Sequence, residues 1–76
     1  MKNVFRDATN DLLQTVSHEE LANALGCSVA TVRQARRDEG TASYRSPPRG
    51  WEKVVVRLAE QKIDLLKRLV ARLRAT

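Results

Sequence analysis

The chain has 76 residues, with 14 Lys and Arg against 9 Asp and Glu, so its net charge is +5. A chain this short buries only roughly 60–65% of the surface that it exposes when unfolded, which makes its stability marginal without a partner. One cysteine, Cys27, and one histidine, His18, exclude an internal disulfide and a tetrahedral zinc site. We therefore expect no metal and no cofactor, and the basic charge favours phosphate or another anionic surface as partner.

The sequence also predicts where the protein works. No apolar run approaches the ~18 residues that a membrane span needs, and the first residues lack the core of a signal peptide. We expect a cytoplasmic protein, in a bacterium or a phage-infected cell, without membrane contact. Residues 1–26 are net acidic, whereas residues 27–50 and 51–76 are net basic. This asymmetry indicates that the partner surface begins near residue 27.

Apolar spacing near the N-terminus predicts a first amphipathic helix, for which Asn3 is a candidate N-cap. The apolar residues recur every three or four positions, and they are Phe5, Ala8, Leu12 and Val16, with Val4 and Leu13 beside them. No stretch alternates with period two, so we expect no sheet and an all-α fold.

Two further helices are predicted from their ends. Ser17 and Glu20 form a capping box at the start of the second helix, and Gly26 ends it in a left-handed conformation. Ser28 is a candidate cap for a third helix over 29–37. The inward residues of these two helices are expected to be Leu21, Ala22, Leu25, Val32 and Ala35.

The second half of the chain contains a loop and one long helix. Glycine, serine and Pro47-Pro48 predict an extended loop from Asp38 to Gly50. A helix from about Trp51 to Arg74 would then be about 36 Å long. We therefore divide the chain into residues 1–50, a helical domain with its loop, and residues 51–76, a helix for core packing and dimerisation.

The last helix has more apolar surface than one small core can cover. Its apolar residues occupy an arc of about 200°, against the ~100° that a single core needs. We expect a homodimer with an interface that includes Val55, Leu58, Leu65, Leu66, Leu69 and Leu73. Lys62 falls within this arc, where it must snorkel or pair with an acidic group. The alternative is a monomer with a frayed C-terminal tail.

The second and third helices together have the layout of a helix-turn-helix. Small or apolar residues occupy the crossing point and the turn, namely Ala22, Leu25, Gly26 and Cys27, followed by Val32 and Ala35. Over about Ser17 to Arg37 the chain resembles the helix-turn-helix regulators of phages and bacteria. This resemblance implies binding to double-stranded DNA, with the third helix in the major groove. The alternative is a plain helical hairpin with solvated charges.

The outward face of the third helix carries no acidic residue before Asp38. Arg33 has the planar fork that binds guanine, and Gln34 has the amide that binds adenine. The small residues Val29 and Ala30 would permit close approach to a thymine methyl. The complete set expected to contact bases is Val29, Ala30, Arg33 and Gln34, and the set expected to contact the DNA backbone is Ser17, His18, Ser28, Arg36, Arg37, Tyr44 and Arg45. For Tyr44, a ring packed on the core is the alternative.

A looser resemblance covers more of the chain. The loop Tyr44-Arg45-Ser46-Pro47, between a helix-turn-helix and a C-terminal helix, is similar to that of small anti-CRISPR-associated repressors, through about Ala59. The resemblance implies a dimer that binds an inverted repeat in a phage or mobile-element promoter.

Together these features predict a homodimeric, sequence-specific DNA-binding regulator, with repression favoured over activation. We expect no enzymatic activity, because the sequence holds no acid–base pair, no nucleophile with a histidine and no phosphate-cradling loop. We also expect no small-molecule ligand. Two rivals remain open: a protein-interaction module, such as an antitoxin or phage adaptor that uses the long helix, and a binder of structured RNA.

Overall fold

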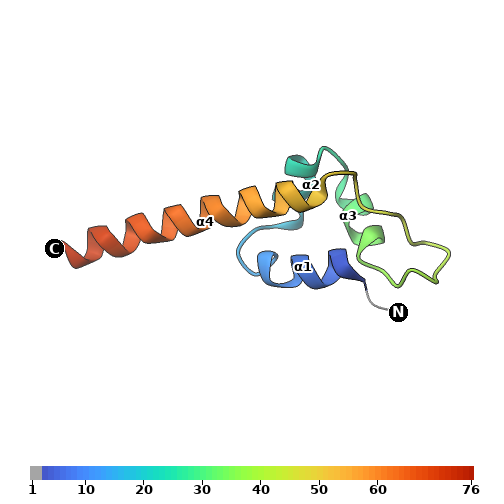
Figure 1. Cartoon of the computed structure of the whole chain (residues 1–76), viewed down its shortest axis with the longest axis horizontal. Coiled ribbons are helices and arrows are strands. Elements are labelled where there is room, and N and C mark those ends of the chain that lie inside the picture. The colour runs from blue at the N-terminus through green and yellow to red at the C-terminus, as the bar shows by residue number, and fades with distance from the viewer. Residues whose placement is uncertain (1–2) are drawn as a thin grey trace.

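The computed structural model describes residues 3–76 and contains four α-helices, which are α1 (Val4–Leu12), α2 (His18–Leu25), α3 (Val29–Ala35) and α4 (Trp51–Arg74). Helices α1 to α3 gather around the first part of α4, and the rest of α4 projects away from them (Figure 1). The molecule is accordingly elongated, at 54 × 23 × 18 Å. The all-α prediction is confirmed for the described residues, which contain no strand.

Side chains cap the first three helices as expected. The Asn3 side chain accepts from the Arg6 amide at 2.9 Å, Ser17 from Glu20 at 3.0 Å and Ser28 from Thr31 at 3.1 Å. The capping box is only half formed, because the Glu20 carboxylate turns to Lys62 of α4, with Oε2 lying 3.4 Å from Nζ.

The first and third helices differ from the sequence prediction. In α1, Ala8 is exposed and the inward position is taken by Thr9, whose hydroxyl donates to the Phe5 carbonyl at 2.8 Å. The prediction for Ala8 was wrong because an internally bonded threonine can occupy an apolar face. Helix α1 ends at Leu12, so Val16 reaches the core from the following turn. Helix α3 ends at Ala35, two residues earlier than expected.

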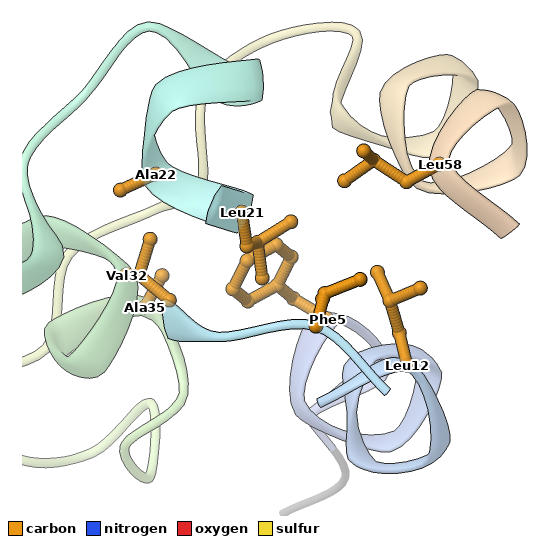
Figure 2. Close-up of a cluster of buried hydrophobic side chains, with 8 residues drawn as sticks. Phe5, Leu12, Leu21, Ala22, Val32, Ala35 and Leu58 are labelled. Atoms are coloured by element: carbon orange, nitrogen blue, oxygen red, sulfur yellow. The ribbon is translucent and has the colours of Figure 1, made fainter. Parts of the chain in front are cut away.

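The core brings together side chains from all four helices (Figure 2). Leu21 of α2 and Val32 of α3 are fully buried, and α2 packs on both α3 and α4. The Phe5 ring of α1 meets the Trp51 ring of α4 edge to face, with centroids 5.1 Å apart. The buried apolar residues are Phe5, Leu12, Val16, Leu21, Ala22, Val32, Ala35 and Leu58.

Helix α4 begins and ends where the sequence predicts, at Trp51 and Arg74. Its first three turns pack on the domain, and Leu58 is the one buried residue of the helix. From Ile63 to Thr76 every residue is exposed. Among residues 3–76, no helix combines the length and the apolar character that a membrane span requires.

Candidate nucleic-acid interface

A three-residue turn joins α2 to α3. Gly26 has φ 74°, in the left-handed region that favours glycine, and the Cys27 amide donates to the Ala22 carbonyl at 3.0 Å. Ala22 is 2% exposed and belongs to the buried core, in which α2 packs on α3. Cys27 is half-buried against the core, and this burial raises the pKa of its thiol. The turn therefore has the small and apolar contacts that the sequence predicted.

The outward face of α3 contains three of the four residues expected to contact bases. Ala30 and Arg33 are exposed, and Gln34 is partly exposed. Val29 is half-buried and packs against the core, so it presents only part of its side chain to a ligand. Arg37, just beyond the helix, is also exposed. Within its seven residues α3 has no acidic side chain, so this face is positively charged.

The loop after α3 returns alongside the helix. The Arg45 amide donates to the Gln34 carbonyl at 3.4 Å, which brings Arg45 next to α3 across eleven positions of sequence. Arg45 is exposed, whereas Tyr44 is half-buried. The backbone of this loop at Arg45 therefore lies next to the C-terminal half of α3.

The first acidic residue after α3 in the sequence, Asp38, is paired with an arginine. Asp38 Oδ1 accepts from Arg6 Nη1 of α1 at 3.1 Å. Both groups are exposed enough for the pair to add little stability. It nevertheless places a positive charge beside the carboxylate that follows the basic face.

Three further residues expected at the DNA backbone lie at the starts of α2 and α3. Ser17 and Ser28 are exposed, and each hydroxyl accepts from an amide as an N-cap. Ser28 Oγ also lies 2.9 Å from Thr31 Oγ1. His18 is half-buried in the first turn of α2. These hydroxyls hold the two helix starts in place, whatever else they contact.

Arg36 differs most from its expected role at phosphate. Its guanidinium turns to α1, where Nη1 donates to the Arg6 carbonyl at 3.1 Å and to the Thr9 hydroxyl, and Nη2 donates to Asn10 Oδ1 at 2.9 Å. Burial, and then the positive charge of Arg6, lower the pKa of Arg36. Arg36 therefore joins α3 to α1 and is not part of the outward basic face.

Asn3 makes a second link between α1 and α3 that the sequence did not reveal. While its side-chain oxygen caps α1, its Nδ2 donates to the Ala35 carbonyl at 2.8 Å and to the Arg37 carbonyl at 2.7 Å. Asn3 is 2% exposed. One side chain thus satisfies the N-terminus of α1 and carbonyls at the C-terminal end of α3. The capping pattern predicted the first bond, but no local pattern indicates the other two.

The residues expected in a dimer interface separate into two groups. Leu58 is buried and Val55 half-buried, and both pack in the core of their own chain. The surface that α4 leaves for a second chain therefore lies beyond them. Four of the expected residues are exposed, namely Leu65, Leu66, Leu69 and Leu73.

No group of three or more histidine, cysteine, aspartate or glutamate side chains within residues 3–76 is arranged to hold a metal ion.

Comparisons of the chain with protein-family models, with curated proteins and with solved structures found no match. The functional argument therefore depends on the geometry and charge of the molecule itself.

Proposed function

We propose that this protein binds double-stranded DNA in a sequence-specific manner and acts as a homodimeric transcriptional repressor. The observation that carries the proposal is the exposed, wholly non-acidic face of α3 with Ala30, Arg33 and Gln34. Arg37 follows this helix directly, and the backbone of Arg45 is bonded to it. An α-helix of this kind fits the major groove of B-DNA, where its side chains can contact base edges.

Each residue on this face has a role in the proposal. The planar guanidinium of Arg33 donates two hydrogen bonds to guanine, and the Gln34 amide pairs with adenine. Ala30 allows the helix backbone to approach closely and contacts a thymine methyl. Arg37 and Arg45, at the end of α3 and in the neighbouring loop, bind phosphates and orient the helix. Arg36 acts indirectly, by fixing α3 against α1.

The test compares two matched arginine substitutions on an operator selected from random DNA. Arg33→Ala should weaken binding by roughly 1–3 kcal/mol and relax the preference at one base pair. Arg68→Ala removes the same side chain from the exposed, projecting part of α4, and should change affinity much less. Fluorescence anisotropy gives the affinities, and repeated selection gives the preferred sequence. Equal effects of the two substitutions would contradict the role of α3.

A protein-interaction module is the second candidate, because the projecting part of α4 exposes a row of large apolar residues. Salt dependence separates the two functions. A protein that neutralises several phosphates loses affinity for random DNA steeply between two salt concentrations. A module without DNA-binding function would show no measurable affinity at either concentration. Structured RNA is less favoured, because the major groove of A-form RNA is too narrow for a helix.

Repression is favoured over activation because covering a promoter needs only occupancy, whereas activation needs a surface that recruits polymerase. The resemblance of Tyr44-Arg45-Ser46-Pro47 to the loop of anti-CRISPR-associated repressors adds a phage or mobile-element promoter as the proposed setting. A reporter gene placed behind the selected operator tests this part: expression should fall when the protein is supplied, and a rise would indicate activation.

A further inference from the structure

Helix α4 carries two adjacent rows of residues at the alternating spacing of three and four that coiled coils use. The inner row consists of Val55, Leu58, Lys62, Leu65 and Leu69. Its first half is used within the chain, since Val55 and Leu58 pack in the core and Lys62 pairs with Glu20. A second row, which we name the outer seam, consists of Val56, Ala59, Ile63, Leu66, Val70 and Leu73.

The outer seam is apolar at all six positions, yet the domain leaves it largely uncovered. Ala59 is half-buried, whereas the other five residues are between 45% and 63% exposed. The seam extends over about 26 Å of helix, roughly a quarter turn away from the face that packs on the domain. A continuous apolar row of this length on a water-soluble helix indicates an interaction surface.

The projecting part of α4 also needs support. Every residue after Lys62 is exposed, so none of the twelve residues from Ile63 to Arg74 is buried against the rest of the described chain. An isolated helix of this length is marginal in water, because helices in proteins gain most of their stability from tertiary packing. A partner that covers the outer seam would supply that packing.

We propose that the outer seam is covered by the outer seam of a second copy of this chain, in a two-stranded antiparallel coiled coil. In heptad terms, Val56, Ile63 and Val70 occupy one core position, and Ala59, Leu66 and Leu73 the other. Branched residues at the first position with leucine at the second favour two strands in parallel coils. The charges beside the seam and the small residue Ala59 within it decide whether the two helices run parallel or antiparallel.

The charged residues beside the seam favour the antiparallel arrangement. With two parallel helices, Lys62 of each chain faces Lys67 of the other, which places like charges together twice. With antiparallel helices centred between residues 64 and 65, Glu60 of each chain faces Lys67 of the other. Reversing one helix therefore adds two attractive pairs near the centre of the coil and moves the two like-charge pairs to its ends, where Lys53 faces Arg74.

The apolar layers favour the same orientation. In a parallel pair, the two Ala59 residues share a layer and leave a void between the helices, which packed cores avoid. In the antiparallel pair, Ala59 lies opposite Val70, and Ile63 lies opposite Leu66. Every layer then contains at least one large side chain. The two-fold axis crosses the pair of α4 helices at its centre. The helical domains of the two chains lie at opposite ends of this pair, on the side of Lys62.

The first test is a matched pair of substitutions in neighbouring leucines of nearly equal exposure, 53% for Leu66 and 58% for Leu65. The wild-type chain should sediment as a dimer at tens of micromolar in the absence of DNA. Leu66→Asp, in the outer seam, should raise the dimer dissociation constant at least tenfold. Leu65→Asp, outside the seam, should change it by less than threefold. A monomeric wild type, or equal effects of the two variants, would overturn the proposal.

The second test fixes the orientation by disulfide cross-linking in a Cys27→Ser background. In the antiparallel dimer, Val56 of one chain lies next to Leu73 of the other, so a mixture of Val56→Cys and Leu73→Cys chains should form a mixed disulfide under mild oxidation. Leu73→Cys alone should remain uncross-linked, because the two copies lie about 25 Å apart. Efficient cross-linking of Leu73→Cys to itself would mean parallel helices and would overturn the proposal.

This inference deepens the homodimer of the proposed function but does not depend on DNA binding. Both tests measure association between copies of the chain with no DNA present. A failed dimer would leave the α3 face to be tested on a single half-site, and a failed DNA assay would leave the association unchanged. The two proposals can therefore fail separately.

Discussion

Replacing Asn3 with alanine should destabilise the domain more than removing an ordinary helix cap. The substitution removes the bond that caps α1 and the two bonds to the Ala35 and Arg37 carbonyls. Loss of an N-cap costs about 0.5–2 kcal/mol. Each lost bond to the Ala35 and Arg37 carbonyls costs about 0.5–1.5 kcal/mol, the net contribution of an ordinary intramolecular hydrogen bond. We expect a total of about 2–4 kcal/mol for Asn3→Ala.

Two control variants separate the cap from the link to α3. Asn3→Ser keeps an oxygen that can cap α1 but has no amide to reach α3. Its unfolding free energy should therefore lie between those of the wild type and Asn3→Ala. Ser28→Ala removes an exposed cap and the exposed bond with the Thr31 hydroxyl, but no link between helices, and should cost about 1 kcal/mol.

Urea unfolding of the variants, followed by circular dichroism at one fixed protein concentration, gives the free energies. If Asn3→Ala were no more destabilising than Ser28→Ala, the bonds from Asn3 to α3 would contribute nothing, and the reasoning would be refuted.

Two further predictions concern the turn between α2 and α3. Gly26→Ala should lower the unfolding free energy by about 1–2 kcal/mol, because alanine is strained at the left-handed φ of 74°. No steric clash adds to this strain, because an added Cβ would meet no atom within 4 Å. Gly40→Ala, where φ is not in that region, should change the unfolding free energy by less than about 0.5 kcal/mol in the same urea assay. Burial raises the pKa of the Cys27 thiol, so at pH 8 the folded protein holds less reactive thiolate than the unfolded chain. Alkylation by iodoacetamide should therefore be slower in buffer than in urea, and equal rates would contradict the burial of Cys27.

The features that the sequence predicted well are those set by local chemistry. Ser17, Ser28 and Gly26 act at helix ends through bonds that span three to five residues, so their roles follow from the order of residues alone. The bounds of α4 were predicted for the same reason, because Gly50 precedes it and a long apolar periodicity defines it. These elements needed no knowledge of how the helices pack.

The features that it missed depend on packing between distant segments. Thr9 lies on an apolar face because its hydroxyl bonds to Phe5 of the same helix and receives the Arg36 guanidinium from α3. Arg36 and Arg37 look equivalent in the sequence, but successive residues point about 100° apart at the end of a helix. One therefore faces α1 and the other faces solvent.

Packing also explains why the sequence revealed the wide apolar arc of α4 but not which of its rows packs on the domain. Hydrophobic periodicity gives the total apolar surface of the helix, whereas the position of the domain decides which row it covers. Val55 and Leu58 are covered by their own chain, which leaves the outer seam as the row that is exposed over nearly its whole length.

Helix α1 thus prepares the proposed DNA-binding face without being part of it. Asn3 holds the carbonyl end of α3, the Arg36 guanidinium is bound by α1, and Arg6 pairs with Asp38, the first carboxylate after the basic face. The side chains left at the outward face of α3 are therefore small, amide or positively charged. Because the Asn3 link is buried and the Arg36 link is partly buried, a change in α1 would alter the position of α3 as well as the stability of the domain. The N-terminal segment and α3 therefore act as one unit, in which the first sets the orientation of the face that we propose to bind DNA.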